Sequence, residues 1–348
     1  MMKSWACIFC LAILSAGCCL VDEDRRDCPP EGKEFSIDYE MRLVTNVQTE
    51  INTVLGLEEN VYVADALRQH LRGIFSDFAH DVDLSFYDVA EPMDVLEHIS
   101  DIIDANQTSY TLHLPVREYM HLAVANIADN KLVDLEAEER CGSSHLRQHG
   151  TDSGTIEPHN TGLFTARLPM DVRANMDQDF LVTLYMANCA TALVLDKTGA
   201  PAISGFNAYT TGFADSFSIA DSTYTYDSDF LVRAEEVPVE GGNERCWATV
   251  QFPSREEPPV TRVVVETTDP FIAENAEEII WKWLVYVTMP DGSVTASTLG
   301  LRKPLRAGQL KIIRIRMGDD GGVYTDDNNV AVSVQLNWQQ GGEHIIDL

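Results

Sequence analysis

Apolar and polar side chains alternate along many short stretches of this 348-residue chain. In Glu34–Val44, EFSIDYEMRLV, the odd-numbered residues from Phe35 to Leu43 are apolar or aromatic, and the residues between them are polar. A period of two residues places each set on a different face of an extended strand. The stretch therefore predicts a β-strand with one buried face, and this kind of pattern constrains the fold more than any other feature of the sequence.

The same alternation recurs along the whole chain and predicts an all-β protein built of β-sandwiches. Apolar residues within 61–79 recur instead at helical spacing, which predicts an amphipathic helix between two strands. We expect a second, short helix around Glu91–Asp104. The further predicted strands are Asp81–Tyr87, Tyr110–Leu114, His121–Ile127, Phe180–Met186, Ala192–Leu195, Cys246–Phe252, Arg262–Glu266, Trp281–Thr288, Lys311–Met317 and Ala331–Trp338.

Residues 1–17 have the features of a secretory signal peptide. Lys3 precedes the uncharged, mostly apolar stretch Trp5–Leu14, and three small residues follow it. Ten residues of helix cover only about half of a bilayer core, so the pattern does not favour a transmembrane helix. Ser15-Ala16-Gly17-Cys18 is similar to a bacterial lipobox, although Ser15 stands where leucine is usual. We expect cleavage before Cys18 and lipidation of Cys18; an ordinary signal peptide is the alternative.

An acidic tether at 18–33 is expected to follow the lipidated cysteine. Asp22, Glu23 and Asp24 resemble the surface-export signal of Bacteroides-type lipoproteins, which favours a lipid-anchored position at the cell surface. The whole chain has 25 Lys and Arg against 55 Asp and Glu, a net charge of −30. Such a chain would repel nucleic-acid phosphates and anionic lipids, so we expect no nucleic-acid partner.

A polar stretch rich in Gly, Ser and Thr lies near the middle of the chain and lacks apolar periodicity. It predicts a solvated linker at 146–162, between an N-terminal β-sandwich at 34–145 and a C-terminal β-sandwich at 163–348. Cys141, His145, His149 and His159 lie in or beside this stretch, but they lack the His-Glu-x-x-His pattern of a metal site. A solvated linker is therefore favoured over a metal site.

Two other cysteines fall in predicted strands. Cys189 and Cys246 could form a disulfide across a sandwich, which is permitted outside the cytoplasm, or stay as buried free thiols. Trp281 and Trp283 share one face of a predicted strand; they would offer a sugar-stacking platform if exposed, but such a pair is more often core.

The sequence contains no nucleophile elbow, phosphate-binding loop or dinucleotide fingerprint. We therefore predict no enzyme activity, no catalytic residues, no cofactor and no metal site. A hydrolase remains a third functional class, with no motif to support it.

Several stretches in chain order carry a family resemblance. They are DCPPEG, the first strand with DYEM, YTLHLPVREYMHLAVANI at Tyr110–Ile127, FLVTLYMANC, and the terminal VAVSVQLNWQQGGEHIIDL. Together with the lipobox they resemble the FimB-type family of fimbrial anchor and minor subunit proteins of Bacteroides-like bacteria. The chain departs from that family in its helical stretch at 61–79 and in Glu118, where glycine is usual.

This resemblance implies two transthyretin-like β-sandwich domains, with a helical insertion in the first, in an outer-membrane lipoprotein. It also implies a non-enzymatic anchor or minor subunit that joins other fimbrial subunits by β-strand addition. The candidate donor or acceptor strands are Phe35–Val44 and Val332–Leu348. A surface glycan-binding lipoprotein or adhesin, with a carbohydrate or host-surface ligand, is the alternative function.

Overall fold

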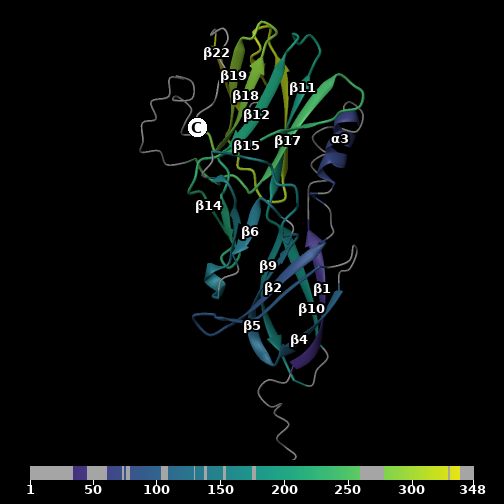
Figure 1. The fold of residues 1–348 in the computed structure, drawn as a ribbon, viewed down its shortest axis with the longest axis vertical. Coiled ribbons are helices and arrows are strands. Elements are labelled where there is room, and N and C mark those ends of the chain that lie inside the picture. Colours follow the sequence, from purple (N-terminus) through teal and green to yellow (C-terminus); the bar gives the residue numbers. More distant parts are fainter. Residues whose placement is uncertain are drawn as a thin grey trace, which may run out of the picture.

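The computed structural model describes residues 34–44, 61–72, 74–75, 79–102, 109–128, 130–136, 139–151, 154–174, 178–258, 278–327 and 330–337. Figure 1 shows an elongated molecule with early strands at one end and later strands at the other. Nearly every element is a strand, so the predicted all-β class is confirmed. The expected signal peptide, the tether and the strand Arg262–Glu266 lie outside the described residues.

Seven strands form the N-terminal sheet, in the order β3-β2-β5-β9-β10-β1-β4. β1 pairs in parallel with β10 on one side and antiparallel with β4 on the other. The strands are β1 (Glu34–Val44), β2 (Asp81–Asp88), β3 (Val95–Ile102), β4 (Ser109–Pro115), β5 (Arg117–Ala125), β9 (Phe164–Val172) and β10 (Asp179–Met186).

The N-terminal sheet folds over on itself between β9 and β10. These strands share only two residue pairs, at the Met186 end of β10, and they diverge beyond them. Tyr39 of β1 and His121 of β5 are three strands apart in the sheet order, yet Tyr39 Oη lies 2.6 Å from His121 Nε2. In a flat sheet three strand spacings would separate them by about 14 Å. The sheet therefore forms two layers around a common core.

His121 is the polar centre of this core. Its Nδ1 donates a hydrogen bond to the carbonyl oxygen of Ser85 at 3.0 Å, so Nε2 accepts the hydroxyl hydrogen of Tyr39. The ring of Phe86 stacks on the imidazole with 4.4 Å between centroids. Burial lowers the pKa of His121 to about 4, so the imidazole is neutral at pH 7.

The helix predicted around Glu91–Asp104 is wrong, because most of this stretch forms β3. Its sequence, VLEHISDI, is too short for apolar spacing to separate a strand from a helix. Antiparallel pairing with β2, from Asp81 with Ile102 to Phe86 with Glu97, fixes it as a strand. The long-range partner decides where the local pattern is ambiguous.

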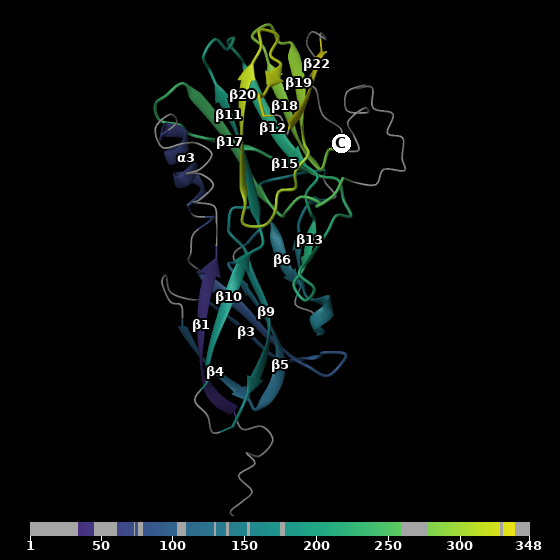
Figure 2. The ribbon, with the colours of Figure 1, turned by 180° about the vertical axis from the view of Figure 1, so that it is seen from behind.

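Two further sheets face each other at the other end of the molecule (Figure 2). Their orders are β16-β17-β11-β20-β21 in the five-stranded sheet and β22-β19-β18-β12-β15-β8 in the six-stranded sheet. Their bounds are β8 (Thr155–Ile156), β11 (Cys189–Asp196), β12 (Gly205–Thr211), β15 (Leu231–Arg233), β16 (Glu235–Val237), β17 (Glu244–Gln251), β18 (Trp281–Thr288), β19 (Val294–Leu301), β20 (Leu310–Met317), β21 (Val323–Tyr324) and β22 (Val330–Asn337).

Inward side chains of these two sheets form one core, which we call the C-terminal core. Trp281 and Trp283 of β18 lie in it with 2% and 0% of their surface exposed, so the prediction that they are core residues is confirmed. Their indole N–H groups donate to the carbonyl of Lys303 at 2.9 Å and to the hydroxyl of Thr191 at 3.3 Å. Each of these Trp residues is therefore buried with its indole N–H hydrogen-bonded.

The stretch predicted as a solvated linker is built into the fold. It begins in β7 (His145–Gln148), which follows a 3₁₀ turn, η1 (Cys141–Ser143), and joins a small sheet with β6 (Val133–Glu136), β13 (Ser216–Ser218) and β14 (Thr223–Thr225). His159 is buried: its Nε2 donates to Gln148 Oε1, and its Nδ1 accepts from Asn188 Nδ2 at 2.8 Å. The expectation of solvation is wrong for His159 because these polar groups satisfy one another.

Strand pairing also differs from the expected boundary at 163. β9 and β10 follow that position yet belong to the N-terminal sheet, whereas β8 precedes it and joins the six-stranded sheet. The chain passes to the C-terminal sheets between Met186 and Cys189. Sheet membership depends on partners far away in the sequence, which a local change of composition does not reveal.

The amphipathic helix is α3 (Val61–Leu71), within the predicted stretch. It follows β1 in the chain but lies beside the five-stranded sheet, as both views show (Figures 1 and 2). Its buried side chains share one core with outward-facing residues of β16 and β17, and His70 Nε2 lies 3.8 Å from Glu235 Oε2. The helix residues in this contact are Val63, Ala64, Leu67 and Leu71.

Gly162 lies where the chain beyond α3 passes the end of residues 146–162, which we call the central segment. A Cβ atom at this position would lie 1.9 Å from the carbonyl oxygen of Ile74, and Asn126 Nδ2 donates to the Gly162 carbonyl at 2.9 Å. A side chain cannot fit without movement of the backbone at Ile74, so glycine is required here.

We expect Leu67→Ala to destabilise the protein by about 3 kcal/mol, because it leaves a cavity between α3 and the five-stranded sheet. Leu67 is 0% exposed, whereas Gln69 is exposed on the same helix, so Gln69→Ala is the matched control. Urea unfolding followed by circular dichroism measures both. Equal stabilities of the two variants would contradict the packing described for α3.

The two buried histidines predict a loss of stability in acid. Burial lowers the pKa of His121 to about 4 and that of His159 to about 3, against about 6.5 in an unfolded chain. Below pH 6.5 the unfolded chain binds protons that the folded chain does not, so stability falls as the pH decreases towards 4. At pH 5 the two residues together cost roughly 4 kcal/mol relative to pH 8.

Unfolding by urea at pH 8 and pH 5 measures this loss. The variant Tyr39→Phe/His121→Leu removes both partners of one buried hydrogen bond and should retain only about half of the histidine-dependent loss. An unchanged loss in this variant would show that the acid sensitivity arises elsewhere.

Candidate functional site

Open sheet edges are the main candidates for interaction with another protein. Each sheet ends in two strands whose outer sides pair with no other named strand of the described chain. Backbone N–H and C=O groups on such an edge can pair with a strand of another molecule. β3 and β22 have eight residues and β4 has seven, whereas the other terminal strands have only two to four. Three edges are therefore long enough for a stable added strand.

The first predicted candidate strand, Phe35–Val44, is not an edge. β4 pairs with β1 over Glu34–Glu40, and β10 pairs with it over Asp38–Val44. The prediction that this strand offers an edge is wrong because β4 and β10 pair with its two sides and place β1 inside the sheet.

The second predicted candidate, Val332–Leu348, begins inside β22. This strand is the end of the six-stranded sheet and pairs along its full length with β19, from Val330 with Leu301 to Asn337 with Val294. Its position at an edge is confirmed for the described part. Residues 338–348 lie outside the described residues.

β3 is the edge that sequence reasoning missed, because the same residues were expected to form a helix. Only Ile99 is half-buried; its other residues are exposed, and 79% of the surface of Ile102 is accessible. Val95 N–H donates to the Glu139 carbonyl at 2.7 Å, so the segment after β6 covers the start of the strand. Leu96–Ile102 stays open among the described strands.

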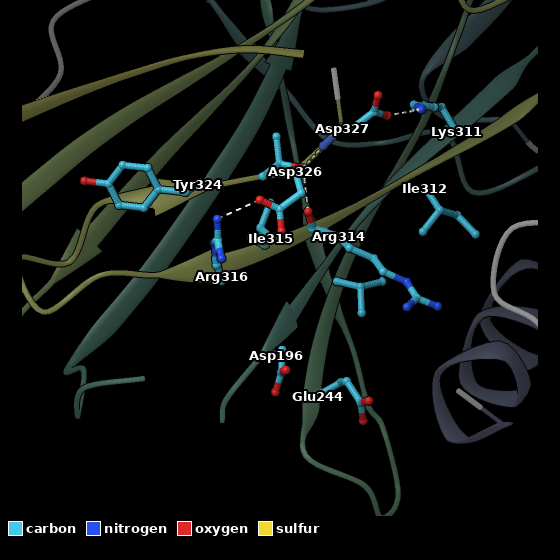
Figure 3. A pocket seen from close by; sticks show the side chains of 12 residues that line it. Asp196, Glu244, Lys311, Ile312, Arg314, Ile315, Arg316, Tyr324, Asp326 and Asp327 are labelled. Carbon is cyan, nitrogen blue, oxygen red and sulfur yellow. Dashed lines mark hydrogen bonds and ion pairs between the residues drawn. The ribbon is translucent and has the colours of Figure 1, made fainter. Parts of the chain in front are cut away.

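A charged pocket of about 590 Å³ lies on the five-stranded sheet, beside α3 (Figure 3). Val194 and Ile312 are among its lining residues. Arg316 Nη2 lies 2.6 Å from Asp326 Oδ1, and Lys311 Nζ lies 2.7 Å from Asp327 Oδ2. These ion pairs occupy one wall, so the pocket is lined by both charge signs.

The other charged lining residues are Arg314 and two acidic residues. Asp196 and Glu244 face the ion pairs across the pocket (Figure 3), and hydrogen bonds from Thr198 lower the pKa of Asp196. Thr325 Oγ1 donates to the Arg314 carbonyl at 2.7 Å and covers part of the β20 edge. The pocket can admit a polar group, but this edge is already occupied by a side chain.

The predicted disulfide between Cys189 and Cys246 is wrong, since both thiols are free and buried. They lie on neighbouring strands of one sheet, where Cys189 pairs with Gln251 and Cys246 with Val194. Cys189 faces the C-terminal core, whereas Cys246 faces α3 and the N-terminal core. Both the register and the opposite faces keep the sulfur atoms apart.

The histidines of the predicted linker have separate environments. His145 Nε2 lies 2.5 Å from Glu136 Oε2, His149 Nε2 lies 2.6 Å from Asp134 Oδ2, and His159 is buried. Within the described ranges, no group of three or more His, Cys, Asp or Glu side chains is arranged to hold a metal ion.

Exposed aromatic side chains do not gather into a platform in the described part of the chain. The exposed tyrosines are Tyr62 on α3, Tyr185 on β10 and Tyr324 on β21. Because Trp281 and Trp283 are buried, the sugar-stacking surface they could have formed is absent.

The expected lipidation residue, Cys18, lies outside the described residues. Within the described part, no helix has the length and apolar character needed to span a bilayer.

Packed β-sheets with three long open edges define an all-β protein. Residues 72–339 match the model of a family described as fimbrillin-A associated anchor proteins Mfa1 and Mfa2. The match covers more than half of the chain, and the chain belongs to this family. The resemblance to fimbrial anchor proteins is thereby confirmed.

Solved structures of similar proteins have low sequence identity to this chain. The fimbrial anchor protein Mfa2 from Porphyromonas gingivalis is 9% identical, with 87% of this chain and 98% of that chain covered and a TM-score of 0.46. A candidate adhesin from Bacteroides ovatus is 12% identical, with 89% and 97% covered and a TM-score of 0.49. No curated protein matches the chain significantly.

The free thiols generate a prediction. Burial raises the pKa of Cys246 to about 12 and that of Cys189 well above its ordinary value. We expect neither residue to react with a maleimide in the native protein, and both to react in 6 M guanidinium without prior reduction. Mass spectrometry of tryptic peptides measures the labelling. Labelling that requires a reductant would reveal a disulfide.

Proposed function

We propose that this chain is a non-enzymatic, cell-surface lipoprotein that serves as the anchor or a minor subunit of a fimbria. The family match over residues 72–339 is the observation that carries the proposal. The long edges β3, β4 and β22 support it, because they offer backbone groups to neighbouring subunits. Holding a filament requires stable contacts and no chemical step.

Two transthyretin-like β-sandwich domains form the proposed architecture. The closed N-terminal sheet supports the first domain, and the five- and six-stranded sheets with their common core support the second. The passage between Met186 and Cys189 is a better boundary than the stretch at 146–162. α3 belongs by sequence to the first domain and by packing to the second.

Attachment to the outer membrane is assigned to Cys18. The thiol of this residue would carry the lipid after removal of 1–17, and the acidic tether at 18–33 would separate the first strand from the membrane surface. Several acyl chains on one cysteine hold a protein firmly, whereas one chain alone binds only marginally. Cys19 has no role in this scheme.

Association with other fimbrial subunits is assigned to strand addition. An extended segment of one subunit would pair with an open edge of its neighbour, in which main-chain hydrogen bonds supply affinity and alternate side chains set the register. A lipid-anchored subunit that keeps its first strand suits a terminal position in the filament.

We expect Cys18→Ala to release the protein, with attached fimbriae, into the culture medium. The variant loses the lipid but keeps the fold, since Cys18 precedes the first strand. Cys19→Ala is the matched control and should remain cell-bound. Immunoblots of medium and membrane fractions, with electron microscopy of the cells, measure the outcome. Fimbriae that stay on Cys18→Ala cells would exclude the anchoring role.

A further inference from the structure

The open edge of β3 has an ordered pattern of charge on one face. Glu97, Ile99 and Asp101 pair with Phe86, Leu84 and Val82 of β2, whose side chains lie in the N-terminal core. Ile99 packs against this core, while Glu97 and Asp101 are exposed on either side of it. An acidic side chain therefore flanks the apolar residue in each direction along the strand.

The opposite face of β3 holds His98, Ser100 and Ile102, and Leu96 lies at a register shift where it pairs with no residue of β2. Leu96 is 36% exposed and Ile102 is 79% exposed, with His98 and Ser100 between them. His98 Nε2 lies 2.8 Å from Asp83 Oδ2 of β2, which fixes this side chain towards the sheet. Ile102 N–H donates to Asp101 Oδ1 at 2.8 Å, so a strand added here would cover Leu96 and would replace this local contact at Ile102.

A second copy of the same strand fits this edge poorly. Antiparallel pairing of two β3 strands about Ile99 would place Glu97 opposite Asp101 at two positions. Like charges directly opposite each other destabilise a strand pair. Charges on an edge strand are a known means of preventing self-association, so Glu97 and Asp101 disfavour pairing with a second β3.

We propose that Leu96–Ile102 of β3 accepts a strand of another fimbrial subunit, and that this strand is complementary in charge. Its seven residues are, in order, apolar, basic, polar, apolar, polar, basic and apolar. The basic residues lie opposite Glu97 and Asp101, the central apolar residue opposite Ile99, and the outer ones opposite Leu96 and Ile102. This pattern reads the same in both directions, so it serves a parallel or an antiparallel strand. The inference rests on the proposed function by strand addition.

A synthetic peptide tests the pattern. Fluorescein-labelled Ile-Lys-Thr-Val-Thr-Lys-Ile, flanked by Gly-Ser for solubility, is titrated with the protein lacking residues 1–17 and carrying Ser at Cys18. Fluorescence anisotropy measures affinity, and hydrogen exchange locates the site. We expect saturable binding, with slower exchange at Leu96–Ile102. The same peptide with Glu in place of both Lys should bind at least about tenfold more weakly.

Replacing both acidic residues of β3 with lysine is the decisive test. Glu97→Lys/Asp101→Lys should reverse the preference between the two peptides, because the favourable and the like-charge pairs exchange places. Asp38→Lys/Glu40→Lys makes the same change of net charge on the exposed side of the interior strand β1, and it should leave the preference unchanged. Melting temperatures check that all variants are folded.

Absence of binding by the Lys peptide would overturn the assignment of β3. Binding that is insensitive to Glu97→Lys/Asp101→Lys, or equally altered by the β1 control, would overturn it too. Release of fimbriae from Cys18→Ala cells tests anchoring independently of β3. Release without peptide binding would therefore reject this edge while leaving the anchor function in place.

Discussion

Closure of the N-terminal sheet is the constraint on which the rest of the structure depends. The hydrogen bond between Tyr39 and His121 lies where the two layers meet, and it exists only because β9 and β10 diverge after two residue pairs. The neutral imidazole can accept from Tyr39 and donate to Ser85 at once, so a polar ring fits inside an apolar core. β1 lies inside this folded sheet, between β10 and β4, and β3 and β4 are the sheet's edges.

A second buried polar group links the two ends of the molecule. Asn188 stands just before β11, where its Nδ2 donates to His159 and its Oδ1 accepts the Leu163 N–H at 2.6 Å. The backbone N–H of His159 donates to the Val250 carbonyl of β17 at 2.7 Å. The central segment is thereby bound to both the N-terminal and the C-terminal strands, and its polarity does not indicate solvation.

Alternation predicted β1 and β18, in which one face is more buried than the other, but it missed β9, β12 and β19. It failed at β3, which is exposed on both faces and so lacks the contrast that the period needs. The free state of Cys189 and Cys246 depends on register, and the position of α3 depends on a surface far along the chain. A local sequence pattern contains no information on strand register or on a distant partner surface. The open edge β3 was missed because its two faces are both exposed, whereas the edge strands β4 and β22 keep an alternating pattern and were predicted.

The placement of α3 has a consequence for the order of folding. Its partner surface on β16 and β17 begins about 160 residues later in the chain. During synthesis the apolar side of the helix is therefore made long before the strands that cover it. The N-terminal sheet shares a core with this helix, so the sheet cannot complete its packing until the C-terminal strands have been made. Such non-local contacts slow folding and expose intermediates to aggregation. A chain cut short before Glu235 would lack the surface that shields α3.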